Sequence, residues 1–187
     1  MFARTERLLL RPGWIEDAPA LFRAIADEGV IRNLASPPWP YTPAHAEAFL
    51  ATERRAGEPS ALVFLRTAAA PELIGTIGIG RKPDGTNELG YWIARPHWGR
   101  GYATEAGRAM LAFARDSLRL GRLAAGHFLD NPASGRVLEK LGFRPTGRIA
   151  PRFSAGRGEA VPSRELELTL RGEAEAEADV KAEAMAA

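Results

Sequence analysis

The chain has 187 residues, of which 45% are hydrophobic and 26% are charged, and it contains no cysteine. A chain of this size buries roughly 70% of the surface that its unfolded form exposes, so it can form one core and a ligand cleft. The lack of cysteine excludes disulfides, thiolate metal sites and a cysteine nucleophile, and it favours an intracellular protein. No segment reaches the roughly 18 apolar residues that a membrane span needs, and Met1–Arg11 lacks a signal-peptide core. We therefore expect a cytoplasmic protein without a membrane partner.

The formal net charge of +2 is unevenly distributed along the chain. Residues 173–187 contain five acids and one lysine and carry −4, so residues 1–172 carry +6, which suits an anionic ligand. Nucleic acid is not an expected partner, because no dense run of Lys and Arg alternates with aromatic residues. We expect one domain over 1–172, followed by an acidic tail over 173–187 that forms a frayed helix or is disordered.

Alternating apolar periodicities predict an α/β fold in the first half of the chain. The expected elements are a strand over Thr5–Arg11, a helix over Ile15–Leu34 capped by Asp17, a helix over His45–Arg55 behind Thr42 and Pro43, and strands over Ala61–Arg66, Leu73–Arg81 and Glu88–Ala94. An Asp-Gly hairpin signal separates the last two strands. This part of the sheet should be antiparallel.

The second half alternates between helical and strand patterns. The expected elements are a helix over Tyr102–Leu118, a strand over Arg122–Leu129, a helix over Pro132–Leu141, and strands over Phe143–Ile149 and Arg164–Leu170. Between the last two strands, Ala150–Ser163 is rich in Arg, Gly and Pro. A loop of that length is usually functional or mobile.

The turn that leads into the Tyr102 helix is the most informative segment. Gly99 and Gly101 allow a ligand to approach the backbone closely, and the first N–H groups of the following helix have no partner within the helix. Together with the helix dipole they form an anion site, to which Thr104 can add a hydroxyl. Pyrophosphate is the natural occupant, although two glycines alone fit a simple strand-to-helix turn equally well.

The turn departs from two other phosphate-binding motifs. The sequence has no Gly-Lys-Ser/Thr, so the turn is not a P-loop. A dinucleotide fingerprint needs glycine where Thr104 stands, and it needs its glycines directly after the strand. Asp130 ends the next strand, where a ribose-binding acid would lie, so a dinucleotide-binding domain stays open as a weaker alternative.

Two motifs in this order resemble a known family. Trp98–Ala106 (WGRGYATEA), followed by Asn131–Phe143 (NPASGRVLEKLGF), is similar to the GNAT superfamily of acetyl-CoA-dependent N-acetyltransferases. The opening TERLLLRP also resembles the branch that contains the ribosomal-protein N-terminal alanine acetyltransferases, so the likeness runs from Thr5 to Leu170. It implies a mixed, mainly antiparallel sheet with helices on both faces and one splayed pair of parallel strands. Trp98 replaces the superfamily's Arg or Gln, so we expect one side-chain contact fewer to phosphate.

The resemblance implies a position for acetyl-CoA. Its pantetheine arm would lie between the splayed strands against Ile93 and Ala94, and a backbone N–H near Trp92 or Ile93 would face the thioester oxygen. The remaining cofactor-binding residues that it implies are Gly99, Arg100, Gly101, Tyr102, Ala103 and Thr104 for the pyrophosphate, together with Asn131 and Arg136.

The expected catalytic residues are Glu88, Ser134 and Asn131. Glu88 stands at the mouth of the splayed strand and is the expected base, directly or through water, although an exposed strand-end glutamate is an equally good interpretation. By resemblance, Ser134 would protonate the departing CoA thiolate and Asn131 would lie near the pantetheine. Asn131 before Pro132 is also a favourable helix N-cap, and Ser134 can bond to its own helix backbone.

The acceptor site is harder to predict. Trp39 and Tyr41, in a Pro-rich connection, and Tyr91 are the expected substrate-binding residues. The branch sometimes carries a glutamate in the hairpin after Ile149, but residues 151–154 contain none. The three histidines are isolated and no acidic cluster has metal-ligand spacing, so no metal is expected.

These observations predict an N-acetyltransferase that moves acetyl from acetyl-CoA to a primary amine by direct attack in a ternary complex. The acceptor could be a protein N-terminus, an amino acid, a polyamine or an aminoglycoside. The alternative from another class is a non-catalytic acyl-CoA-binding or sensor domain. Either a monomer or a homodimer is compatible with the sequence.

Overall fold

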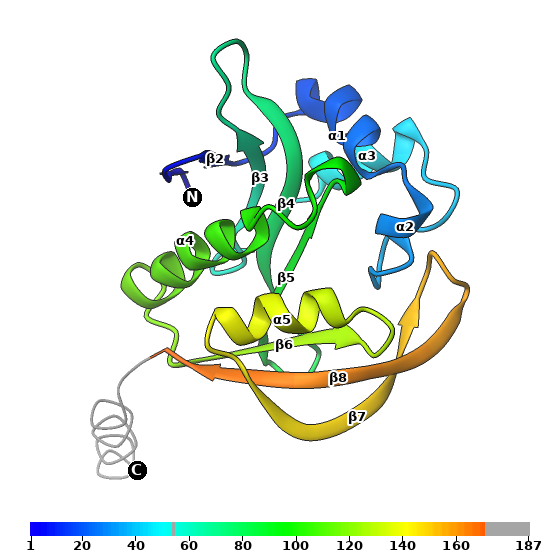
Figure 1. Cartoon of the computed structure of the whole chain (residues 1–187), viewed down its shortest axis with the longest axis vertical. Helices are drawn as coiled ribbons and strands as arrows, with labels where there is room; N and C mark the ends of the chain where they lie inside the picture. Colours follow the sequence, from blue (N-terminus) through cyan, green and yellow to red (C-terminus); the bar gives the residue numbers. More distant parts are fainter. Residues whose placement is uncertain (54, 171–187) are drawn as a thin grey trace.

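The structure is a computed structural model that describes residues 1–53 and 55–170 (Figure 1). Within these ranges one mixed sheet has the strand order β1-β2-β3-β4-β5-β6-β8-β7. Its strands are β1 (Ala3–Arg4), β2 (Leu8–Arg11), β3 (Ser60–Leu65), β4 (Glu72–Arg81), β5 (Asn87–Ile93), β6 (Arg122–Phe128), β7 (Arg144–Ser154) and β8 (Glu159–Thr169). Every neighbouring pair is antiparallel except β5 and β6. The predicted fold class is confirmed.

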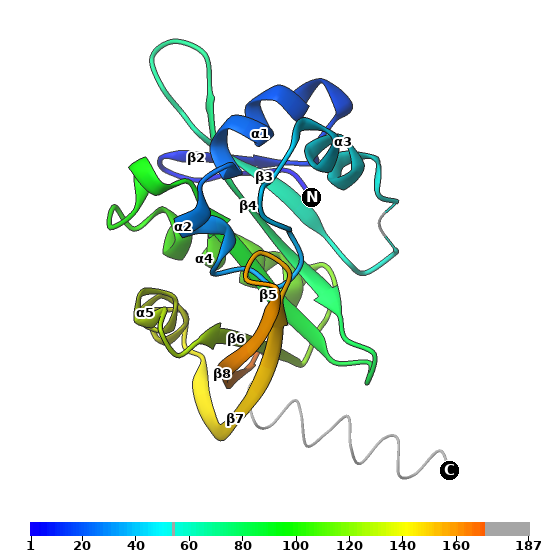
Figure 2. The same ribbon diagram turned by 90° about the vertical axis from the view of Figure 1, so that its right-hand side faces the viewer.

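Helices cover both faces of this sheet (Figure 2). One face carries α1 (Ala18–Ile25), α2 (Glu28–Ile31) and α3 (Pro43–Ala51), and the other carries α4 (Tyr102–Asp116) and α5 (Pro132–Lys140). Two short 3-10 helices, η1 (Ile15–Asp17) and η2 (Arg95–His97), precede α1 and α4. Successive strand residues face opposite sides, so Leu62 packs into the core under α1–α3 and Val63 into the core under α4 and α5. No helix in the described part of the chain is long and apolar enough to cross a membrane.

The parallel strands β5 and β6 are paired only at their beginnings. Glu88 lies opposite Ala124, and no further pair joins the two strands within the described residues. In contrast, the whole length of β5 pairs with β4, from Asn87 opposite Arg81 to Ile93 opposite Gly75. The sheet is therefore split beyond Glu88, as the resemblance implied.

The N-terminal segment differs from its predicted form. The expected strand over Thr5–Arg11 is a hairpin of β1 and β2, because the Thr5 N–H donates to the Leu8 carbonyl (2.9 Å) and turns the chain. The expected helix over 15–34 is divided into η1, α1 and α2, and Asp27 caps α2 by accepting from the Val30 N–H (3.2 Å). Asp17 precedes α1 but caps no N–H of that helix.

The predicted loop over Ala150–Ser163 is wrong. β7 and β8 extend through most of it and leave only residues 155–158 as a turn. The turn is fixed to the end of α2: Ser154 Oγ donates to the Leu34 carbonyl (2.8 Å), and the Ala155 N–H donates to the Ala35 carbonyl (2.9 Å). Gly and Pro in this segment therefore serve an edge strand and its turn. The predicted acidic tail lies outside the described residues.

A carboxylate in the first turn of α4 holds the N-terminal hairpin. Glu105 accepts hydrogen bonds from the Thr5 hydroxyl (2.6 Å), the Arg7 N–H (2.9 Å) and the Arg7 Nε (2.7 Å). Burial acts to raise the pKa of Glu105, but these hydrogen bonds outweigh it and keep the pKa below its ordinary value of 4.5. The ionised carboxylate therefore stabilises the folded state and fixes α4 against β2.

We expect Glu105→Gln to lower the free energy of unfolding by about 1–2 kcal/mol at neutral pH, because it removes charge-assisted hydrogen bonds. The folded-state pKa of Glu105 is depressed, so its stabilisation is present above the unfolded-state value and is lost as the pH falls through the lower folded-state value. Urea unfolding of both proteins should therefore show a gap that closes on acidification. Glu139→Gln, at an exposed position of α5, is the control. Equal midpoints for wild type and Glu105→Gln at neutral pH would contradict the assignment.

Candidate functional site

One cavity of about 880 Å³ connects the two faces of the sheet at the split between β5 and β6. Its lining comes from α1–α3, from both splayed strands and from the N-terminal ends of α4 and α5. Most of the expected site residues line it, namely Tyr41, Glu88, Tyr91, Ile93, Gly99, Gly101, Tyr102, Ala103, Thr104, Asn131, Ser134 and Arg136. Trp39, Ala94 and Arg100 do not.

The turn before α4 has the geometry of an anion site. Gly99 (φ 75°) and Gly101 (φ 80°) are in the left-handed region, where a Cβ is strained. The first turn of α4 is closed by the Glu105 N–H, which donates to the Gly101 carbonyl (3.0 Å), and no side chain caps this end. The N–H groups of residues 102–104 are therefore directed at whatever lies in front of the helix. Arg7 stabilises the turn, because its Nη1 donates to the Arg100 carbonyl (3.0 Å).

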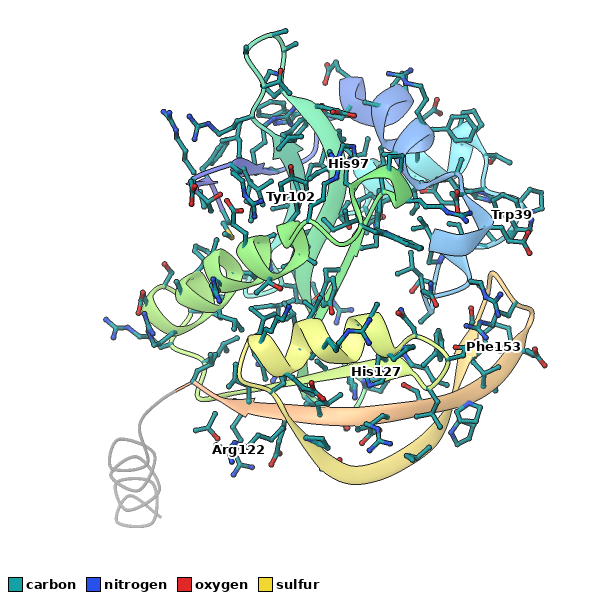
Figure 3. All side chains as sticks on the ribbon, viewed as in Figure 1. Trp39, His97, Tyr102, Arg122, His127 and Phe153 are labelled. Carbon is teal, nitrogen blue, oxygen red and sulfur yellow. The ribbon has the colours of Figure 1, made fainter. Side chains whose placement is uncertain are left out.

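Two aromatic residues fix this turn to the rest of the sheet. Trp98 Nε1 donates to the Ile93 carbonyl (2.6 Å), so the indole N–H is used within the protein. At the start of α4, the ring centroids of Tyr102 and His97 are 6.2 Å apart (Figure 3). The Arg7 guanidinium carbon lies over the Tyr102 ring, 4.6 Å from its centroid. Tyr102 and Trp98 therefore hold the turn in place.

The backbone of β5 offers hydrogen-bonding groups to the split. The Ala94 N–H donates to the Ile74 carbonyl in β4 (2.7 Å), so it is not available to a ligand. Because N–H groups alternate in direction along a strand, those of Tyr91 and Ile93 point away from β4, toward β6. Of the two donors expected near the thioester oxygen, Ile93 therefore has the suitable direction and Trp92 does not.

Asn131 and Ser134 occupy the first turn of α5. The Asn131 side chain accepts from the Ser134 N–H (3.3 Å) and Pro132 follows it, which confirms the expected N-cap. Ser134 Oγ lies 2.9 Å from the Tyr91 hydroxyl, which also donates to the Ser134 carbonyl (3.1 Å). Burial raises the pKa of Tyr91 to about 12, although the hydrogen bond with Ser134 acts in the opposite direction. Tyr91 is therefore neutral at physiological pH and contacts α5.

Glu88 forms an ion pair that the sequence did not reveal. Arg152 Nη1 and Nη2 donate to Glu88 Oε1 (2.6 Å) and Oε2 (2.9 Å), and Lys82 Nζ lies 3.5 Å from Oε1. The hydrogen bonds to Glu88 raise the pKa of Arg152 against the effect of burial, so the guanidinium stays charged. Only 14% of the Glu88 side chain is exposed. Glu88 is thus not the ordinary exposed glutamate of the alternative interpretation.

Arg152 was missed because it lies in the segment predicted to be a loop. Its strand, β7, pairs only with β8 and brings Arg152 beside Gly126 of β6. A Cβ on Gly126 would lie 3.3 Å from Arg152 Nη1, so the glycine leaves room for the guanidinium. The sequence signal for this residue was an arginine in a long segment near the end of the chain. That signal did not identify Glu88 as its partner, because the two residues lie on strands that are distant in the sequence.

The cavity continues under the first three helices into a part that we call the α1–α3 chamber. Its apolar lining is formed by Leu21, Ile25, Val30, Leu34, Phe49 and Trp92. Tyr41 is buried at its edge, with its ring 5.3 Å from that of His45. Trp39 is 41% exposed and lies outside the cavity, near the outer end of the connection (Figure 3).

Asp130 has a structural role in place of ribose binding. It accepts two hydrogen bonds from Arg157 (2.7 and 2.9 Å) and lies 3.3 Å from Arg32. β5 and β6 are the only parallel neighbours in the described sheet, whereas a dinucleotide-binding fold needs a mostly parallel sheet. No group of metal-ligating side chains occurs among the described residues.

A mixed sheet split between two parallel strands, with an anion turn at one side of the split, defines the acetyltransferase class of α/β proteins. The model of the acetyltransferase (GNAT) domain matches residues 7–144, and the chain belongs to this family. An uncharacterised N-acetyltransferase, YoaA of Bacillus subtilis, is 32% identical over 76% of this chain and 82% of its own length.

Solved structures agree with this assignment. A GNAT-family acetyltransferase from Bacillus anthracis superposes with a TM-score of 0.76 at 25% identity, covering 91% of this chain and 99% of that one. A ribosomal L7/L12 alpha-N-protein acetyltransferase in complex with coenzyme A has the same fold, with a TM-score of 0.72 at 16% identity and coverage of 90% and 98%. The expected likeness to ribosomal-protein acetyltransferases is confirmed in sequence by the ribosomal-protein-serine acetyltransferase of Escherichia coli, which is 36% identical over 38% of this chain and 41% of its own length.

The contact between β5 and α5 can be measured as a coupling energy. We expect Tyr91→Phe and Ser134→Ala to be non-additive in the free energy of unfolding by about 1 kcal/mol, because each removes one partner of the same hydrogen bond. Chemical unfolding of the two single variants and the double variant gives this value. Strict additivity would show that the two hydroxyls do not interact in solution.

Proposed function

We propose that this GNAT-family protein transfers acetyl from acetyl-CoA to a primary amine by direct attack in a ternary complex. The observation that carries the proposal is the cavity's continuity from the anion turn, through the split, to Glu88. One continuous space allows a long donor on the α4–α5 side to meet an acceptor in the α1–α3 chamber. Family membership supports the transfer chemistry.

Coenzyme A would bind along the split. The glycine turn and the free N–H groups of residues 102–104 suit the pyrophosphate, and Arg136 and Lys140 on α5 line the same side of the cavity. The Ile93 N–H suits the thioester oxygen, whose negative charge grows during attack. Ala94 is not assigned a contact with the donor, because it lies outside the cavity lining and its N–H is used in the sheet. When bound, the donor supplies an activated acetyl group.

Two side chains would handle the protons. Glu88 accepts one proton from the attacking amine, directly or through water, as the new C–N bond forms. Ser134 donates a proton to the sulfur as the C–S bond breaks, and the Tyr91 hydroxyl positions Ser134 for this step. The proton taken up by Glu88 returns to Ser134 through water, so the products are the acetylated amine and the free thiol of coenzyme A, and no oxidant or further reactant is needed. Asn131 caps the N-terminal end of α5, which carries Ser134.

The competing function is a non-catalytic acyl-CoA-binding or sensor domain, which needs the cradle but no acceptor chemistry. Titration calorimetry with acetyl-CoA, followed by thiol release over a panel of amines, separates the two. We expect both binding and amine-dependent thiol release. Binding without turnover on any amine would favour the sensor, and failure to bind acetyl-CoA would exclude both.

Gly101→Ala should raise the dissociation constant for coenzyme A by about 5- to 30-fold, because a Cβ costs roughly 1–2 kcal/mol in the left-handed region and the turn relaxes away from its binding shape. Calorimetry of the variant measures this. Gly121→Ala is the matched control, since that glycine has open space around it and no left-handed φ. Unchanged affinity of Gly101→Ala would remove the turn from the binding site.

Glu88→Gln should lower kcat/KM by about 100-fold at neutral pH, because glutamine cannot accept a proton from the attacking amine. Thiol release between about pH 6 and pH 9 tests this, with the exposed Glu167→Gln of β8 as control. Full activity of Glu88→Gln over that range would exclude Glu88 as the base.

A further inference from the structure

The charges around Glu88 leave an excess positive charge at the base of the α1–α3 chamber. Glu88 is shared between Arg152 and Lys82, and Glu165, which also acts on Arg152, is paired with Arg148, so two carboxylates are set against three cations. The cluster lies where β5 and β6 begin to separate, because Glu88 is the last paired residue and Arg152 adjoins Gly126 on the opposite strand. A cationic cluster at this point attracts a carboxylate.

The rest of the chamber does not suit a polycation. Apart from Glu88, the only other carboxylate in the cavity lining is Glu58. The other walls combine the apolar side chains of α1–α3 and Trp92 with neutral polar side chains such as Asn33, Thr52 and Thr76, and none of these carries a negative charge. Polyamines and aminoglycosides carry several ammonium groups, each of which needs an anionic or hydrogen-bonding partner when it is buried. The lining instead fits a compact ligand with an apolar body.

The turn between β7 and β8 fixes the segment that follows α2. Ser154, Ala155 and Arg157 bond to the carbonyls of Leu34, Ala35 and Arg32, with distances of 2.8, 2.9 and 2.6 Å. Gly156 packs so closely on Ile31 that no Cβ would fit. Figures 1 and 2 show this turn beside the end of α2. Leu34 and Ala35 line the cavity, so these contacts hold one wall of the chamber in place.

We propose that the acceptor is a free α-amino acid with an apolar side chain, whose carboxylate binds Arg152 and whose amine binds Glu88. This inference rests on the proposed acetyltransferase function. An α-amino acid carries both charges on one carbon, so it replaces the single ion pair by two and leaves neither Glu88 nor Arg152 unpaired. The side chain then occupies the apolar part of the chamber.

The ion pair gives this acceptor a way to activate its own acetylation. While Arg152 holds both Glu88 oxygens, the carboxylate is a poor acceptor for an amine proton. A substrate carboxylate that takes over the guanidinium releases Glu88 at the same moment that it places the amine beside it. An amine without a carboxylate leaves the original pair intact and gains neither effect.

Thiol release with leucine, methionine and phenylalanine, each compared with its own primary amide, tests the inference. The two members of each pair share the α-amine and the side chain and differ in the carboxylate. We expect kcat/KM for the acids to exceed that for the amides by at least about 100-fold. Amides or short peptides that react as fast as the acids would overturn the inference and leave the proposed function standing. Failure of every amine to release thiol would overturn the proposed function and this inference with it.

Variants of Arg152 test whether this residue binds the carboxylate of the acceptor. Arg152→Gln should reduce kcat/KM for the acids to the level of the amides, whereas Arg148→Gln, an exposed arginine on the same strand, should leave the ratio unchanged. Because Arg152→Gln leaves Glu88 buried without its partner, thermal unfolding is measured for each variant, and Arg152→Lys is tested beside it. Lysine keeps the charge but not the two-point geometry, so we expect an acid-to-amide ratio about tenfold lower. An unchanged ratio in folded Arg152→Lys and Arg152→Gln would overturn the role of Arg152.

Discussion

The site depends on a missing set of hydrogen bonds. β5 and β6 are joined at Glu88 and Ala124 and then separate, so the backbone groups of Tyr91 and Ile93 that point toward β6 lack a strand partner. Buried backbone groups without partners are costly, and a sheet that leaves them open gains when a ligand with amide groups fills the gap. The N-terminal ends of α4 and α5 lie at the borders of this gap, which is why an anion site and a hydroxyl donor occur beside it.

Several side chains keep the split open and shaped. Trp98 bonds to the Ile93 carbonyl on one side, and Arg152 reaches from β7 past Gly126 to Glu88 on the other. Gly90 and Gly126 lie on the two strands that border the split and place no side chain in it. A Cβ on Gly90 would meet nothing within 4 Å, so the space beside it is open. Trp98, Arg152 and the two glycines therefore shape the opening through which the cavity passes from one face of the sheet to the other.

Local patterns in the sequence predicted most of the fold. The strands over residues 60–93, α3 behind Thr42 and Pro43, and α5 behind Asn131 appear within a few residues of their expected bounds, because their caps, glycines and periodicities are local signals. The break of the first helix at Ala26 and the length of the β7–β8 hairpin were missed. The break coincides with the local cap that Asp27 gives α2, whereas the hairpin is held by contacts to a segment that is distant in the sequence.

The candidate site was predictable to the same extent. The turn around Gly99 and Gly101 and the cap at Asn131 follow from short motifs, and the cavity contains both. Arg152 beside Glu88 and Tyr91 beside Ser134 are pairs 64 and 43 residues apart, and no spacing rule relates such positions. Their partners are set by strand order and by the face of β5 on which each side chain lies, which are known only once the sheet is assembled.

The support of the anion turn by Arg7 has a consequence for the order in which the site forms. Arg7 and Glu105 are 98 residues apart, and the Arg7 contact to Arg100 spans 93. Contacts of such separation need the intervening chain to be ordered before they offset the entropy of closing a long loop. During synthesis the N-terminal hairpin emerges well before α4. Its contacts with Glu105 and Arg100 can therefore form only after about half of the protein has been made. Ligand-binding ability should consequently be among the last properties that the folding chain acquires.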